Sequence, residues 1–125
     1  MYRIIDPYFI HRDDRGEIVG VLNFGTWREI NYIKSEAGAN RGNHYHCDTE
    51  ELFFVLKGRI RVEVQRVDAG LLVGAVEGFI VGQGAVFVVE PMVNHVFHVL
   101  DAADWINVLS NPIDPERPDI HRISV

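Results

Sequence analysis

The chain has 125 residues, of which 47% are hydrophobic and 24% are charged, and its formal net charge is −6. A chain of this length can bury about two-thirds of its unfolded surface in one core, which predicts a single domain over residues 1–125 and argues against disorder. The acidic balance and the lack of Lys and Arg runs argue against nucleic acid as a partner, and no apolar run reaches the ~20 residues of a membrane span. At the amino terminus, Asp6 and Pro7 interrupt the apolar sequence before a secretory signal could form, and a single cysteine cannot make an internal disulfide. We therefore expect a cytoplasmic protein.

Short runs of β-branched and aromatic residues, which are typical of strands, follow one another along the chain. These runs cover residues 18–24, 30–33, 52–56, 59–66, 71–76, 85–89, 95–100 and 105–109. The clearest alternation places Ile60, Val62 and Val64 on one face of a strand. Only residues 101–104 could make a turn of helix. The pattern predicts an all-β sandwich or closed barrel. We expect its core to contain five phenylalanines: Phe53, Phe54, Phe79, Phe87 and Phe97.

The carboxyl-terminal part of the chain has a different composition. Pro112, Pro115 and Pro118 follow the last predicted strand at short intervals. Because proline fixes φ and lacks an N–H donor, such a segment does not continue a sheet. We expect residues 111–120 to form an extended, irregular strap over the surface.

Two histidines and a glutamate in the middle of the chain are spaced for metal binding. His44 and His46 are two residues apart, so an extended strand aims both imidazoles toward the same side. Glu51 opens the next predicted strand, and an antiparallel return would bring its carboxylate to the same point. His95, at the start of a later strand, is the natural fourth ligand. Three imidazoles and one carboxylate in a barrel mouth suit a divalent transition metal.

A fixed spacing links five residues of this region: Gly38, His44, His46, Glu51 and Gly58. By chance the pattern G-x5-H-x-H-x4-E-x6-G should occur on the order of 10⁻⁴ times in a chain this long. It is similar to the first cupin motif, and its spacing selects Glu51 over Glu50. Residues 84–95 resemble the second motif, with Pro91-Met92 where cupins usually have Pro-Gly. The resemblance implies a small single-domain cupin, a double-stranded β-helix or jelly-roll barrel.

A narrower resemblance covers most of the chain. Asp-Arg-Gly at 14–16, Arg-Gly-Asn-His-Tyr-His at 41–46 and Ile-Asp-Pro-Glu-Arg-Pro-Asp at 113–119 resemble the C-terminal cupin domain of bifunctional capsular-polysaccharide enzymes. The first two elements also resemble dTDP-sugar 3,5-epimerases and 3,4-ketoisomerases. The resemblance implies a metal-dependent epimerase or isomerase of a nucleotide-linked keto sugar, with zinc as the ion and Fe²⁺, Mn²⁺ or Ni²⁺ as alternatives. In the capsular enzymes a reductase domain completes the synthesis, so a separate reductase is an expected partner.

If both histidines of the motif bind an ion, another group must move the proton during catalysis. The candidates near the motif are Tyr32, Lys34, Tyr45 and His98, and the sequence does not rank them. Arg41 could bind a phosphate of the nucleotide or only solvate its loop, and Asn43 is a second candidate for substrate binding. Cys47 should point away from the face of His46, which favours a small packed residue over a metal ligand.

Two other functions agree with the same residues. Three histidines and a glutamate also suit an iron(II) dioxygenase, and a cupin can bind a sugar or a metal without catalysis. Whatever its function, we expect the chain to form a homodimer, because an apolar barrel commonly buries one sheet face against a second copy. Val19, Val21 and the face of Ile60 would then belong to the core or to the interface.

Overall fold

The computed structural model describes residues 1–123, and this part of the chain is built from strands. No helix within it is long and apolar enough to cross a membrane. The strands are β1 (Tyr2–Ile5), β2 (Phe9–Asp13), β3 (Gly16–Gly20), β4 (Glu29–Ser35), β5 (Asn40–His44), β6 (Glu51–Lys57), β7 (Ile60–Asp68), β8 (Leu71–Val81), β9 (Val86–Val89), β10 (Val93–Val99) and β11 (Ala103–Leu109).

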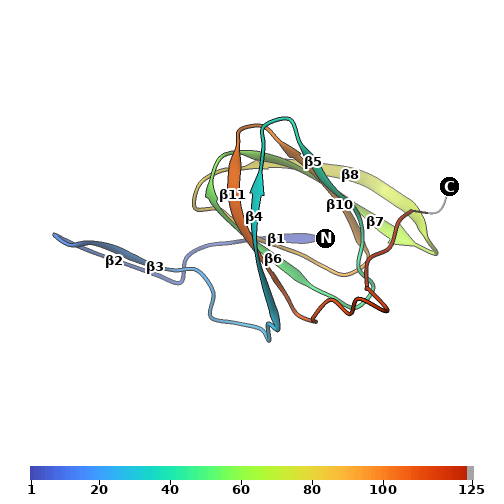
Figure 1. The fold of residues 1–125 in the computed structure, drawn as a ribbon, viewed down its shortest axis with the longest axis horizontal. Helices are drawn as coiled ribbons and strands as arrows, with labels where there is room; N and C mark the ends of the chain where they lie inside the picture. Colours follow the sequence, from blue (N-terminus) through green and yellow to red (C-terminus); the bar gives the residue numbers. More distant parts are fainter. Residues whose placement is uncertain (124–125) are drawn as a thin grey trace.

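Two antiparallel sheets face each other and form the body of the molecule (Figure 1). One sheet has the order β1-β9-β6-β11-β4, and the other has the order β5-β10-β7-β8. Neighbouring strands in each sheet are often distant in sequence, as expected for a jelly roll. The all-β fold class predicted from the sequence is therefore confirmed.

The core lies between the two sheets, on the faces that they turn toward each other. In β7, Ile60, Val62 and Val64 are buried and face the core, as the alternation predicts. Trp105 from β11 packs against Phe53 and Phe97 at ring-centroid distances of 5.5 and 5.0 Å. These contacts join the two sheets in one apolar cluster.

A second, smaller apolar cluster covers the outer face of the five-stranded sheet. Leu52, Val86 and Val88 point outward there and are nevertheless buried. The segment of residues 21–27 covers them with Val21, Leu22, Phe24 and Trp27. This explains why the predicted strand at 18–24 ends early, because β3 stops at Gly20 and the chain then crosses the sheet.

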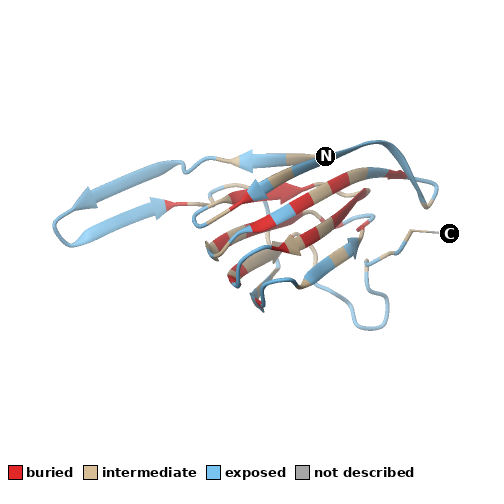
Figure 2. Cartoon of the chain, turned by 90° about the horizontal axis from the view of Figure 1, so that it is seen from above, coloured by how far each residue is buried: buried red, intermediate tan, exposed pale blue. Residues whose placement is uncertain are grey.

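β2 and β3 form a hairpin that pairs with no other strand of the described residues. It extends away from the body, as Figures 1 and 2 show, and nearly all of its residues are exposed. We call residues 9–20 the hairpin arm. Its register places Ile10 opposite Val19 and His11 opposite Ile18.

Several details differ from the predicted elements. β1 and β2 were not predicted, because they are short and β2 contains charged residues. The extended strand expected through His44 and His46 corresponds to β5, which ends at His44. Residues 101–104 form no helical turn, since β11 begins at Ala103 and Asp101 is bound by Arg59. Phe54 and Phe79 are only half-buried, whereas the other three phenylalanines lie in the core. Residues 111–120 contain no strand.

Candidate functional site

A β-bulge brings His44 and His95 together. β5 pairs with β10, with His44 opposite His95, and the register shifts immediately after His95. The extra residue is Asn43, whose φ of 59° lies in the left-handed region. Gly42 before it has a φ of 81°, and a Cβ there would lie 2.7 Å from the carbonyl oxygen of His95. Glycine is therefore required for β5 to approach β10 this closely.

The altered second motif preserves the backbone that glycine would adopt. Met92, which stands where cupins usually have glycine, has a φ of 60°. Its amide donates to the carbonyl of His46 at 2.7 Å, and its carbonyl accepts from Val67 at 3.0 Å. These two hydrogen bonds hold the loop before β10, so His95 still enters the site from the start of that strand.

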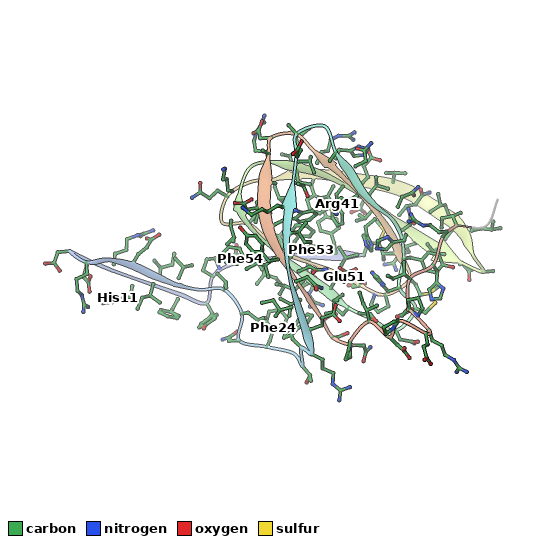
Figure 3. All side chains as sticks on the ribbon, viewed as in Figure 1. His11, Phe24, Arg41, Glu51, Phe53 and Phe54 are labelled. Atoms are coloured by element: carbon green, nitrogen blue, oxygen red, sulfur yellow. The ribbon has the colours of Figure 1, made fainter. Side chains whose placement is uncertain are left out.

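The four predicted metal ligands converge between the two sheets. The ring centroids of His44 and His95 lie 4.7 Å apart, those of His44 and His46 5.1 Å apart, and those of His46 and His95 5.4 Å apart. Oε1 of Glu51 contacts Nε2 of His46 and lies 3.6 Å from Nε2 of His95. One donor atom from each of these residues lies within 4.8 Å of every other. Figure 3 places Glu51 inside the outline of the barrel.

The four side chains line a cavity of about 190 Å³. Both sheets and the carboxyl-terminal segment contribute to its wall. The remaining lining residues are Ile33, Arg41, Gly42, Phe53, Phe97, Trp105, Asn107, Leu109, Ile113 and Ile120. The cavity is thus mostly apolar, with its polar donors gathered at one place, which is the usual composition of a small-molecule site.

The chemistry of these donors fits a metal ion. Nδ1 of His95 bonds to the carbonyl of Val93 at 3.1 Å, and Nδ1 of His46 bonds to the carbonyl of Asp119 at 2.5 Å. Both Nε2 atoms are buried and make no hydrogen bond of acceptable geometry within the described residues, although that of His46 contacts Glu51. Buried polar atoms without partners are costly, and a cation among three imidazoles and a carboxylate would satisfy them.

Burial and the mutual contacts of the cluster set its protonation. Burial, together with His95 and His46, lowers the pKa of His44 to about 4. Burial also lowers the pKa of His95. For His46 burial acts in the same direction, but Glu51 outweighs it and raises the pKa of His46 above its ordinary value. Burial would raise the pKa of Glu51, yet contact with His46 keeps it below the ordinary value. Near neutral pH the site therefore holds an ionised carboxylate next to His46 and two neutral imidazoles.

The four residues predicted to move the proton do not line the cavity. Tyr32 and Lys34 are exposed on the outer side of β4. His98 faces away from the core, where its Nδ1 bonds to Asn40 at 3.0 Å. Tyr45 is buried beside the ring of His121. Alternation turns Tyr32, Lys34 and His98 outward, and Tyr45 packs beside His121, so none of the four lines the cavity of its own chain. Their part in proton transfer stays a prediction.

The other predicted residues divide between the cavity and the surface. Arg41 lines the cavity, where its Nε donates to Oγ of Ser35 at 2.7 Å. Asn43 lies on the outer face, near Asn94, and does not line the cavity. Cys47 is exposed, so the expectation of a packed cysteine is wrong, because the loop after His46 leaves the barrel.

Sequence reasoning missed three polar residues of the site. Asn107 donates to Oε2 of Glu51 at 2.9 Å. Asp119 bonds to His46, as described above. Arg122 donates to the carbonyls of Gly42 and Asn43 at 2.9 and 2.8 Å, next to the bulge. Asn107 could have been found, because alternation along the predicted strand at 105–109 places it on the inward face with Trp105. Asp119 lies in the motif at 113–119, but nothing in the sequence predicts its contact with His46 or the contacts of Arg122.

A family model described as "Polysaccharide biosynthesis C-terminal domain" matches residues 11–120. The chain belongs to this family. The match spans both sheets, all four converging donors and most of the carboxyl-terminal segment. It agrees with the resemblance to capsular-polysaccharide enzymes that the sequence motifs carry. No curated protein sequence matches the chain closely enough to count as a relative.

Solved structures of the cupin fold superpose on most of the chain. CapF, the capsular polysaccharide assembling protein of Staphylococcus aureus, is 21% identical, with a TM-score of 0.70 over 94% of this chain and 34% of that chain. The chain thus spans about a third of the length of CapF. A 3,4-ketoisomerase from Helicobacter canadensis is 16% identical, with a TM-score of 0.78 and coverages of 97% and 90%. The dTDP-4-dehydrorhamnose 3,5-epimerase of Elizabethkingia anophelis is 22% identical, with a TM-score of 0.76 and coverages of 92% and 72%. These likenesses establish the cupin fold of the chain.

Proposed function

We propose that this chain is a metal-dependent epimerase or isomerase of a nucleotide-linked keto sugar, acting in polysaccharide or deoxysugar biosynthesis. The observation that carries the proposal is the convergence of His44, His46, Glu51 and His95 in one mostly apolar cavity. Membership of the polysaccharide biosynthesis family supports the sugar substrate. The fold shared with a sugar ketoisomerase and a sugar epimerase supports the type of reaction.

Three of these residues, His46, Glu51 and His95, are the proposed ligands of one divalent ion, with zinc as the first candidate, and His44 lies beside them as the fourth donor. Such an ion would act as a Lewis acid toward the carbonyl oxygen of the sugar. Asn107 donates to Glu51 and holds its carboxylate toward the histidines. The carbonyls of Val93 and Asp119 fix the rings of His95 and His46. These supports would keep the donors in place before any ion arrives.

His44 is the proposed proton acceptor. Apart from the four donors, Arg41 is the only ionisable side chain in the described lining of the cavity, and a guanidinium cannot accept a proton. His44 is the least buried of the four. With a pKa of about 4 it is neutral near pH 7 and can take a proton. His46, Glu51 and His95 would still retain the ion, since two histidines and one carboxylate suffice in catalytic sites.

The size and lining of the cavity suit the sugar rather than the whole nucleotide sugar. At about 190 Å³ the cavity is smaller than the ~300 Å³ lower limit of typical ligand pockets, so the nucleotide would lie outside. Ile33, Leu109 and Ile113 offer apolar surface to the less polar face of a deoxysugar. Arg41 would meet the phosphates or the ring hydroxyls.

Metal analysis of matched variants tests the ligand set. We expect one divalent ion per purified chain, determined by elemental analysis. His46→Ala should lose the ion, and Glu51→Gln should bind it more than ~10-fold more weakly because the charged donor is gone. Glu50→Gln changes the neighbouring residue in the same way and should leave the affinity unchanged. Full occupancy of a His44→Ala, His46→Ala double variant would overturn the proposed site.

Incubation in D₂O with a panel of nucleotide-linked 4-keto sugars tests the reaction. We expect deuterium to enter the carbon next to the carbonyl, and inverted or isomerised sugar to accumulate. His44→Ala should retain the ion and lose the exchange. Consumption of O₂ without exchange would favour a dioxygenase instead. Sugar binding with neither reaction would make the chain a binding module.

The proposal also includes a second copy of the chain and a separate reductase. The hairpin arm supports the homodimer, because an isolated two-stranded hairpin is only marginally stable in water. Ile10 and Ile18 in the arm are 47% and 61% exposed, and Ile30 on the open edge strand β4 is 69% exposed. The arm of one protomer packing on its partner would cover such residues. A reductase would be needed to turn a keto product into a stable sugar.

A further inference from the structure

The loop between His46 and Glu51 connects two of the proposed metal ligands. It consists of Cys47, Asp48, Thr49 and Glu50 and has no strand structure. Thr49 is buried, whereas Cys47 and Asp48 are exposed. Because the loop is short, its backbone determines how the imidazole of His46 and the carboxylate of Glu51 meet.

The carboxylate of Asp119 holds this loop from the other end of the chain. Its Oδ1 accepts from the amide of Cys47 at 2.7 Å. Its Oδ2 accepts from the amide of Asp48 and from the hydroxyl of Thr49, each at 2.8 Å. Three donors on consecutive residues thus bind one carboxylate, and hydrogen bonds to an ionised acceptor are the stronger kind.

The backbone of Asp119 also acts directly on a proposed ligand. Its carbonyl lies 2.5 Å from Nδ1 of His46, which must therefore carry the proton of that ring. The lone pair of the neutral ring is then on Nε2, the atom that faces Glu51. The segment is further anchored by paired main-chain hydrogen bonds between Tyr45 and His121, at 3.0 and 2.9 Å.

We propose that Asp119 is a positioning residue, which clips the carboxyl-terminal segment onto the 47–49 loop and thereby presets His46 and Glu51 for the metal. The metal part of this inference rests on the proposed function. The same segment carries Ile113 and Ile120 into the cavity wall, so the clip fixes part of the substrate pocket as well. The motif at 113–119 thus has a physical role, since its last residue joins the wall of the cavity to the ligand loop.

Metal affinity of matched variants tests the clip. Asp119→Asn keeps the shape of the side chain and its carbonyl but leaves only one oxygen to accept from the loop. We expect its dissociation constant for Zn²⁺, measured by competition with a chromophoric chelator, to rise ~10-fold or more. Asp48→Asn is the control, because it removes one negative charge from the loop itself and the Asp48 carboxylate forms none of the hydrogen bonds described here. If both variants raised the dissociation constant for Zn²⁺ equally, Asp119 would act only through its negative charge and not through its hydrogen bonds, and the proposal would be overturned.

Amide hydrogen exchange tests the clip without a metal. In the apo protein, the amides of Cys47 and Asp48 should be protected, and Asp119→Asn should lose that protection while core amides of β7 keep theirs. Thr49→Val removes one of the three donors and should give a smaller change in the same direction, which carries the test if Asp119→Asn does not fold. Unprotected amides in the wild-type chain would overturn the clip. Protected amides in a chain that binds no metal would instead overturn the proposed function alone.

Discussion

Glu51 shows how single residues set the character of the site. Its side chain is buried, with 4% of the residue exposed, yet its carboxylate is kept ionised by His46 and by the amide of Asn107. A buried charge without partners would cost several kcal/mol, so this arrangement requires nearby cations or donors. Below its raised pKa, His46 supplies the positive charge in the apo protein, and a metal ion would replace its proton.

Metal binding should release about one proton at pH 6. His46 has a raised pKa, so it is mostly protonated there and must lose its proton before Nε2 can bind. His44, with a pKa of about 4, is already neutral, the lowered pKa of His95 favours its neutral form, and the lowered pKa of Glu51 keeps it ionised. Metal affinity should therefore fall as the pH drops below the raised pKa of His46 and become independent of pH above it. Calorimetry in two buffers of different ionisation enthalpy counts the protons, and a release of two or more would show that His44 or His95 is charged in the apo protein.

The four converging donors could be predicted from the sequence, whereas the residues that support them could not. The pair His44 and His46 follows from strand periodicity, and Glu51 follows from a fixed spacing within the same motif. Asn107 and Asp119 meet these residues only after 56 to 73 positions of intervening chain have folded. The four candidates named for proton transfer are sequence neighbours of the motif, and the folded chain places none of them in the cavity.

At the scale of elements, the bulge in β5 decides how closely β5 approaches β10 within the four-stranded sheet. Gly42 and Gly38 both have left-handed φ values, of 81° and 87°. They differ in surroundings, because a Cβ on Gly42 would meet the carbonyl of His95, whereas a Cβ on Gly38 would meet nothing within 4 Å. The pair therefore separates backbone strain from the approach of β5 to β10.

Gly42→Ala should destabilise the apo protein more than Gly38→Ala does. Both variants should lose about 1–2 kcal/mol to left-handed strain. Gly42→Ala should lose about 1–3 kcal/mol more, because the carbonyl of His95 must move. Urea unfolding measures the difference, and metal affinity should fall only in Gly42→Ala. Equal stabilities would mean that β5 can shift without disturbing His95.

Strands rich in β-branched and aromatic residues were the predictable part of the fold. β6, β7, β9, β10 and β11 have this composition and bury one or both faces, so the sequence predicts them. β5 carries Arg41, Gly42 and Asn43, which favour loops, and it is a strand only because β10 pairs with it. Tertiary pairing thus overrides local preference at the strand that carries the site.

At the scale of the whole molecule, the body consists of two facing sheets and the hairpin arm is its one long projection among the described residues (Figure 2). A two-fold dimer would cover the same patch of both copies. Such an interface could form by packing of the arm of each protomer on the open β4 side of its partner. Such an interface would cover the exposed apolar residues of the hairpin arm and those of β4.

The protein should be dimeric at micromolar concentration, and the arm should control this state. Ile18→Asp should shift the mass measured by light scattering toward the monomer, because a charge would be buried in the interface. Ile80→Asp on β8 is the control, since Ile80 is 59% exposed, like Ile18 at 61%, but lies on the other sheet. A monomeric wild-type chain would rule out the dimer. A dimeric Ile18→Asp variant would show that the interface does not involve the hairpin arm.

The central claim is that the four converging donors support sugar isomerisation through a bound metal. The most direct test compares metal-loaded and chelated protein in the rate at which solvent deuterium enters the carbon beside the carbonyl of a nucleotide-linked 4-keto sugar. We expect chelation to abolish the exchange and added Zn²⁺ to restore it, with an unchanged far-UV circular dichroism spectrum because the fold has its own core. Equally fast exchange in the chelated protein would contradict the claim and leave the reaction to the histidines alone.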